Sequence, residues 1–127
     1  MMERFAVAPR AGFQAVEFHF PYQWAAAELS GRLTDDGLEQ VVINAPAGDW
    51  DAGERGLAGL PGRQGEFAET IGLAIDFARA LACPRIHVMA GLAGDDAGRA
   101  QITFIGIAAA PARKPTTAYI SGLRLSR

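Results

Sequence analysis

Short apolar segments alternate along this chain with longer amphipathic ones, and this alternation restricts the fold more than any other feature. We expect strands at residues 14–19, 40–44 and 85–89, and helices at 3–11, 23–34, 64–82 and from 99 to about 110. Strands that alternate with helices are typical of a parallel sheet whose right-handed crossovers place the helices on one side. The sequence therefore predicts an α/β fold with parallel strands adjacent in chain order.

The clearest helix spans residues 64–82. Its apolar residues recur at helical spacing and form one stripe that faces a core: Phe67, Ile71, Ala74, Ile75, Ala78 and Leu81. In the helix at 23–34, Ala25, Leu29 and Leu33 share a face, and Gly37 is expected to end it because glycine accepts the left-handed conformation. The apolar, mostly β-branched strand 41–44 is typical of a strand that is buried in a parallel sheet.

Composition and charge exclude several classes of protein. The formal net charge is −2 and the basic residues are scattered, so we expect no nucleic-acid partner. No apolar run reaches the roughly 18 residues of a membrane span, and the first residues lack the apolar region of a signal peptide. The single cysteine, Cys83, excludes an internal disulfide; we interpret it as a small buried thiol, and it favours a cytoplasmic location.

Three ordered segments resemble one family of enzymes. The first is the long glycine-rich loop at 45–63, and the second joins Ala11-Gly12-Phe13 to the AVEF and FPY runs within 15–22. The third combines FARAL at 77–81 with VMAG at 88–91. From about residue 3 to residue 105, the chain is similar to the hydroxypyruvate isomerase family.

The resemblance implies a (β/α)8 TIM barrel of the xylose-isomerase type, which interconverts hydroxypyruvate and tartronate semialdehyde. A complete barrel needs roughly 250 residues, so we expect a partial barrel: strands two to four with their helices, without the first strand and the C-terminal half. The expected domain covers residues 1–106. Residues 107–127 are expected to be a divergent tail, from truncation, a chimeric gene or a reading-frame slip.

The family's two catalytic glutamates lie on its fifth and eighth strands, often with a divalent metal nearby. We therefore assign no catalytic residue, metal ligand or cofactor to this chain. We expect the isolated chain to show no isomerase activity, since a general acid–base pair supplies several orders of magnitude in rate.

Substrate-binding residues can still be sought, because barrel sites lie at the C-terminal ends of strands. Tyr22 follows the first expected strand, and Asn44 ends the second. Asn44 either hydrogen-bonds a substrate hydroxyl or carbonyl or caps a loop turn. His87 alternates with Ile86 and Val88, so it either points into the barrel or is a satisfied core histidine.

Arg55 lies in the long loop and is the fourth candidate. A guanidinium grips a carboxylate through two parallel hydrogen bonds, and hydroxypyruvate carries a carboxylate. The alternative is a local salt bridge to Asp51 or Glu54. Trp50 either closes over the pocket or packs under the loop, and Glu17 is better explained by a structural ion pair than by a role as a base.

Three functions follow from these observations. The chain is an isomerase domain that binds a small hydroxy-carbonyl acid, or a non-catalytic half-barrel that associates with itself or a partner through open sheet edges near Val16 and Val88. The third is a related barrel, a sugar epimerase or isomerase or an abasic-site endonuclease. The match of the 45–63 loop and the acidic charge favour the first two.

Overall fold

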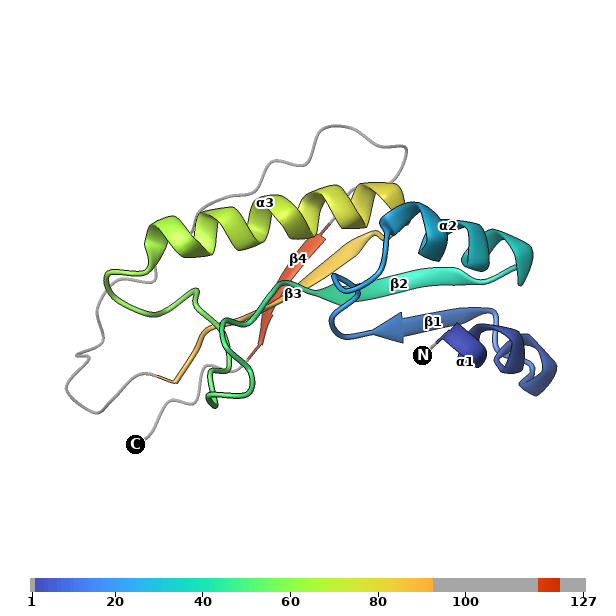
Figure 1. Ribbon diagram of the computed structural model, residues 1–127, viewed down its shortest axis with the longest axis horizontal. Coiled ribbons are helices and arrows are strands. Elements are labelled where there is room, and N and C mark those ends of the chain that lie inside the picture. Colours follow the sequence, from blue (N-terminus) through green and yellow to red (C-terminus); the bar gives the residue numbers. More distant parts are fainter. Residues whose placement is uncertain (1, 93–116, 122–127) are drawn as a thin grey trace.

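The structure is a computed structural model, and it describes residues 2–92 and the backbone of residues 117–121. The helices are α1 (Met2–Val7), η1 (Pro9–Ala11, a 3-10 turn), α2 (Ala26–Asp35) and α3 (Gln64–Ala80). The strands are β1 (Ala15–Phe18), β2 (Glu39–Asn44), β3 (Arg85–Met89) and β4 (Thr117–Ser121). All neighbouring strands are parallel, in the order β1-β2-β3-β4 (Figure 1). The predicted parallel sheet in chain order is confirmed.

The predicted bounds differ from the observed ones mainly at the start of α2. Leu29 and Leu33 are buried as expected. Ala25 is exposed and precedes the helix, with extended backbone dihedrals, so its predicted place in the buried stripe is wrong. Pro21 delays the helix, because the loop after it first makes a turn from Pro21 O to Trp24 N. The helix expected from residue 99 lies outside the described residues.

The fourth strand corrects one expectation about the edges of the sheet. We expected the strand around Val88 to have an open edge, but β3 pairs with β4 from Arg85↔Thr117 to Met89↔Ser121. A segment of the expected divergent tail therefore continues the parallel order. Of the three predicted strands, β1 alone has a single neighbouring strand within the part of the chain that the structure describes.

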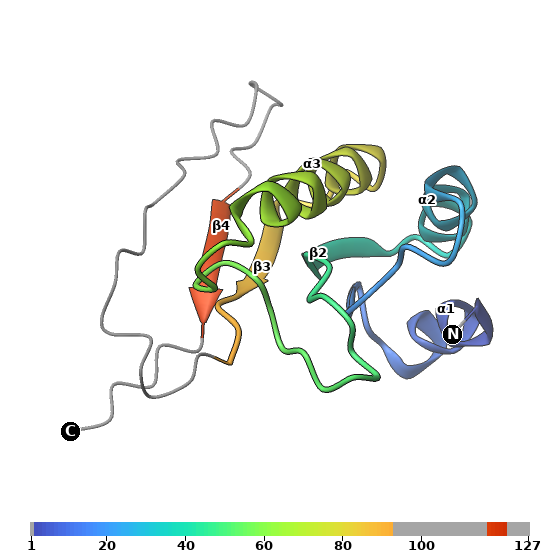
Figure 2. The same ribbon diagram turned by 60° about the vertical axis from the view of Figure 1, so that its left-hand side comes forward.

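The core lies between the sheet and its helices, which line up along one side of it (Figure 2). Ile43, Ile86 and Val88 point to that side and are at most 3% exposed. The predicted stripe of α3 packs against them: Ile71, Ala74, Ala78 and Leu81 are buried, while Phe67 and Ile75 are partly buried. Alternate strand residues therefore point to the opposite face, which carries no helix among the described residues.

A bulge in β2 adjusts which side chains reach the core. Val16 pairs with Gln40 and Glu17 with Val42, so Val41 is an extra residue in β2. Gln40 is therefore on the core side although it is three residues before Ile43, and it is 3% exposed. Its Nε2 donates to the Val42 carbonyl at 2.6 Å, which satisfies a carbonyl group beside the bulge.

The same C-terminal motif ends α2 and α3, with a different residue at the left-handed position. After α2, Leu38 N–H donates to Leu33 O at 2.8 Å and Gly37 N–H to Thr34 O at 3.2 Å. After α3, Cys83 N–H donates to Ala78 O at 2.8 Å and Ala82 N–H to Arg79 O at 3.2 Å. Both are Schellman motifs. Gly37 has φ 64° and Ala82 has φ 50°, so alanine occupies a conformation that favours glycine.

We expect Ala82→Gly to raise the free energy of unfolding by about 1 kcal/mol, because it removes the Cβ that the left-handed backbone crowds. Ala82 is exposed, so no packing is lost. Gly37→Ala is the matched control: a Cβ there meets no atom within 4 Å, and it should lower stability by a similar amount through the backbone alone. Urea unfolding of the three proteins measures both changes. Two shifts of the same sign would contradict this account.

Candidate functional site at the carboxyl edge of the sheet

The helix-free face of the sheet brings two of the predicted residues together. Asn44 ends β2 and is the Cα partner of His87 in β3. Their side chains meet, with Asn44 Oδ1 3.1 Å from His87 Nδ1. An amide oxygen accepts and does not donate, so Nδ1 carries the proton of this hydrogen bond. The amide group of Asn44 keeps its two N–H donors for other partners. His87 is thus on the face opposite the core and not among the core residues.

Tyr22 contacts this pair through the backbone of Asn44. Its ring packs edge-on against Phe77 of α3 with centroids 5.0 Å apart, and its hydroxyl donates to the backbone carbonyl of Asn44. Burial, with a smaller contribution from Cys83, raises the pKa of this hydroxyl above its usual value, so it stays a donor. Tyr22 therefore holds the end of β2 through Asn44. Its role in binding substrate stays a prediction.

Arg55 does not make the local salt bridge that was the alternative to a binding role. Its Nη1 donates to the carbonyls of Trp50, at 3.0 Å, and Glu54, at 2.6 Å. Its guanidinium carbon lies 3.9 Å from the centroid of the Trp50 ring. The Glu54 carboxylate binds Arg63 instead, and this contact lowers the pKa of Glu54. Among the described residues, Arg55 has no carboxylate partner.

The loop that carries Arg55 is bound closely to the sheet. Gly56 N–H donates to Ala47 O at 2.9 Å, and Gly59 N–H donates to Ala90 O at 2.7 Å. Gly56 also forms an antiparallel bridge with Ala90, directly after β3. Gly56 has φ 116°, and any Cβ there would overlap the Met89 carbonyl, so only glycine allows this approach. The loop is therefore bound to the end of β3 through Gly56 and Gly59.

Sequence reasoning missed two features of this loop. Arg63, at the start of α3, binds both Glu54 and Glu66, and Glu54 also accepts the Asp49 N–H at 2.6 Å. Trp50 packs on Phe20, which follows β1, with ring centroids 5.2 Å apart. The Phe20–Trp50 contact joins residues far apart in the sequence, so spacing alone does not indicate it, whereas the contacts of Arg63 and Glu54 are local to the loop and the first turn of α3.

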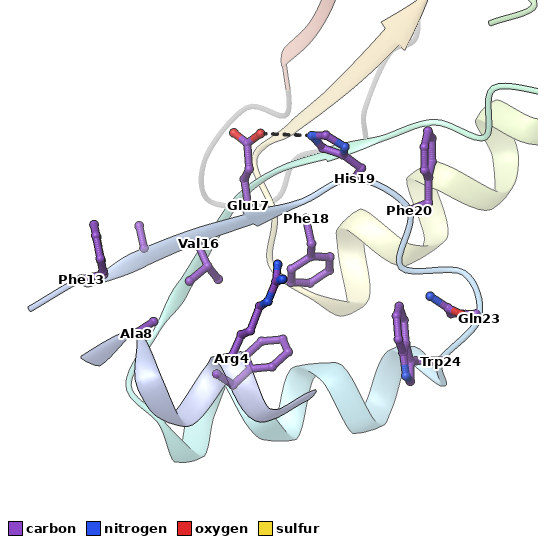
Figure 3. A pocket seen from close by; sticks show the side chains of 12 residues that line it. Arg4, Ala8, Phe13, Val16, Glu17, Phe18, His19, Phe20, Gln23 and Trp24 are labelled. Atoms are coloured by element: carbon purple, nitrogen blue, oxygen red, sulfur yellow. Dashed lines mark ion pairs between the residues drawn. The ribbon is translucent and has the colours of Figure 1, made fainter. Parts of the chain in front are cut away.

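A hollow of about 830 Å³ lies along β1, and Phe20 is one of the residues that line it. Figure 3 shows Glu17 and His19 on one side of β1, and Val16, Phe18 and Arg4 on the other. Glu17 Oε1 lies 3.7 Å from His19 Nε2, and both side chains are more than half exposed. Glu17 thus has a histidine partner at the surface of the described chain, and the two form an ion pair only when His19 is protonated. The hollow occupies the side of β1 that has no neighbouring strand among the described residues.

Neither a metal centre nor a reactive thiol is formed by the described residues. No group of three or more His, Cys, Asp or Glu side chains gathers there in a way that would hold a metal ion. Cys83 is 3% exposed and its Sγ contacts Arg85 O at 3.2 Å, and burial raises the pKa of the thiol. The prediction of a small buried thiol is confirmed. No helix in residues 2–92 is long and apolar enough to cross a membrane.

Comparison with known proteins decides the family. The model of the "Xylose isomerase-like TIM barrel" family matches residues 5–108, which is most of the chain. The chain belongs to the xylose isomerase-like TIM barrel family. The three predicted strands, their helices and their parallel order are accordingly part of such a barrel.

Individual relatives of this xylose isomerase-like chain are isomerases by name. It is 57% identical over 100 residues to a 2-oxo-tetronate isomerase of Cupriavidus necator, covering 79% of this chain and 38% of that protein. It is 46% identical over 90 residues to hydroxypyruvate isomerase of Escherichia coli, covering 71% of this chain and 35% of that protein. The resemblance to hydroxypyruvate isomerases is confirmed. The chain spans well under half the length of these relatives.

A solved structure is similar as well. The crystal structure described as an AP endonuclease, family 2, from Brucella melitensis superposes with a TM-score of 0.70 at 46% identity. The match covers 71% of this chain and 35% of that one. The likeness again concerns one part of a larger barrel.

We expect Gly56→Ala to loosen the loop far more than Gly53→Ala. Both glycines have positive φ, so each substitution costs about 1 kcal/mol through the backbone. A Cβ at Gly53 meets open space, whereas one at Gly56 overlaps β3, which should add at least about 2 kcal/mol. Urea unfolding gives the stabilities, and hydrogen exchange of the Gly59 amide reports the loop. Equal effects of the two substitutions would show that the bridge to Ala90 is not what holds the loop.

Proposed function

We propose that this chain provides the substrate-binding edge of an isomerase for short hydroxy-carbonyl acids such as hydroxypyruvate. One observation carries the proposal: Asn44, at the carboxyl end of β2, meets His87 of the neighbouring β3 on the helix-free face. Barrel active sites are built at this end of the strands. The names of the relatives, hydroxypyruvate and 2-oxo-tetronate isomerases, support the same class of substrate.

Each residue has a distinct part in this proposal. The amide N–H groups of Asn44 donate to the substrate carbonyl or hydroxyl, and His87 fixes the amide through its Nδ1. Tyr22 holds the backbone of Asn44 in place. Arg55 binds the substrate carboxylate through donors that its backbone contacts leave unused. We assign the proton transfer to none of the described residues.

A divalent metal is the cofactor that the family suggests. The described residues do not fit one by themselves, because they offer no cluster of three ligating side chains. The proposal therefore routes no step through a metal. Binding by Asn44 and Arg55 needs hydrogen-bond donors only, so it should persist in the presence of a chelator.

The two histidines of the chain allow a direct test. In a proton NMR titration with hydroxypyruvate, we expect the ring signals of His87 to shift in a saturable way. His19, exposed beside β1, is the internal control and should not follow. Asn44→Ala should weaken binding about tenfold, in line with the loss of one hydrogen bond of about 1–1.5 kcal/mol. Unchanged His87 signals at millimolar ligand would refute the proposed function.

A second role is supported by the free edge of β1. An unpaired strand edge exposes backbone donors and acceptors to another chain, and the hollow beside it is lined by apolar residues such as Phe13 and Val16. A second copy of this chain is the partner that we propose for it. We expected open edges at both β1 and β3. Because β3 pairs with β4, of these two the edge at β1 is the open one among the described residues.

We expect the chain to sediment as a dimer or larger species. Phe13→Lys should shift it toward monomer, because Phe13 is 62% exposed and lines the hollow, so a charge there opposes docking at little cost to folding. Leu73→Lys is the matched control: Leu73 is 44% exposed on α3, away from the hollow, and should leave the mass unchanged. A stable monomer of the unaltered chain in analytical ultracentrifugation would rule out this role.

A further inference from the structure

Three side chains form a continuous stack across the carboxyl edge of the sheet. Phe20 follows β1, and its ring lies 5.2 Å from that of Trp50, measured between centroids, at a tilt of 58°. On Trp50 lies the guanidinium of Arg55, 3.9 Å from the ring centroid. The next residue, Gly56, is bound to Ala47 after β2 and to Ala90 after β3. The stack therefore extends from the end of β1 to a loop that is bound to the end of β3.

The guanidinium of Arg55 is held in place by contacts that do not neutralise its charge. Its hydrogen bonds within the described residues all come from Nη1 and go to carbonyl oxygens, which carry no net charge. The adjacent carboxylate, Glu54, is engaged by Arg63 and by the Asp49 N–H. A guanidinium has five N–H donors in one plane and stays charged. The Nη1 contacts and the Trp50 ring therefore hold the guanidinium while the donors on Nε and Nη2 and the full positive charge stay available to a ligand.

We propose that Trp50, backed by Phe20, is a positioning residue that orients Arg55 for the carboxylate of the substrate. The stack would set specificity for hydroxy-carbonyl acids over neutral hydroxy-carbonyl compounds of the same size. A flat aromatic face under a guanidinium restricts it to one plane, and a planar fork is what two parallel hydrogen bonds to a carboxylate require. This inference rests on the proposed function, to which it adds the basis of selectivity.

Two ligands that differ at one group provide the probe. Hydroxypyruvate carries a carboxylate where dihydroxyacetone carries a neutral hydroxymethyl group. Binding of each is measured by the His87 NMR shift, which does not depend on the tryptophan under study. In the unaltered chain we expect hydroxypyruvate to bind at least tenfold more tightly than dihydroxyacetone.

Three variants separate positioning from a general structural role. Trp50→Leu should reduce the preference for hydroxypyruvate about tenfold while it leaves the affinity for dihydroxyacetone unchanged. Trp50→Phe keeps an aromatic face and should restore most of the preference. Trp24→Phe, at the other tryptophan, is the control and should change neither affinity. Because Trp50 is 44% exposed, its two substitutions should leave the fold intact, and circular dichroism verifies this for all three variants.

Arg55→Lys gives a second, independent measure. It keeps the charge but loses the planar fork, so we expect the preference for hydroxypyruvate to fall about tenfold. If Trp50→Leu weakens both ligands equally, or Arg55→Lys leaves the preference intact, the inference is overturned while the proposed function stands. If neither ligand shifts His87 in the unaltered chain, the proposed function itself fails.

Discussion

The parallel pairing of β2 with β3 is the interaction on which the rest of the structure depends. It places Ile43 beside Ile86 and Asn44 beside His87. Because side chains alternate across a strand, one register buries the isoleucines under the helices and brings the amide and the imidazole together on the other face. A slip of one residue would exchange the two faces. The hydrophobic core therefore positions the candidate site.

The long loop between β2 and α3 extends this arrangement to the edge of the sheet. It is held by glycine at two close approaches to the end of β3: a Cβ at Gly56 would overlap Met89, and one at Gly91 would approach Gly56 O. At its far end Arg63 binds Glu54 and Glu66, which ties the loop to the first turn of α3. Loops of this length are often mobile lids. Here backbone contacts with Met89 and Ala90, at the end of β3, hold it against the sheet.

The two arginines of this loop show why charge alone does not indicate which arginine could bind an anion. Arg55 and Arg63 both lie near Glu54 in the sequence. Arg63 has two carboxylate partners, whereas Arg55 is held by an indole ring and two carbonyls. An arginine that its own protein neutralises offers little to an anionic ligand. The difference arises from the path of the loop, which turns Glu54 toward α3 and away from its neighbour.

The sequence by itself determined the α/β class, the parallel order of three strands and the buried stripe of α3, because spacings of two and of three to four residues report which face is apolar. It also indicated Asn44 at the end of a strand, His87 within a strand between Ile86 and Val88, and the family through the 45–63 loop. The tertiary structure decided the features that the spacing of apolar residues does not report. The bulge at Val41, the pairing of β3 with β4, and the packing of Phe20 on Trp50 arise from contacts between distant segments. They depend on which distant segments the folded chain brings side by side, and neither local spacing nor residue type specifies this.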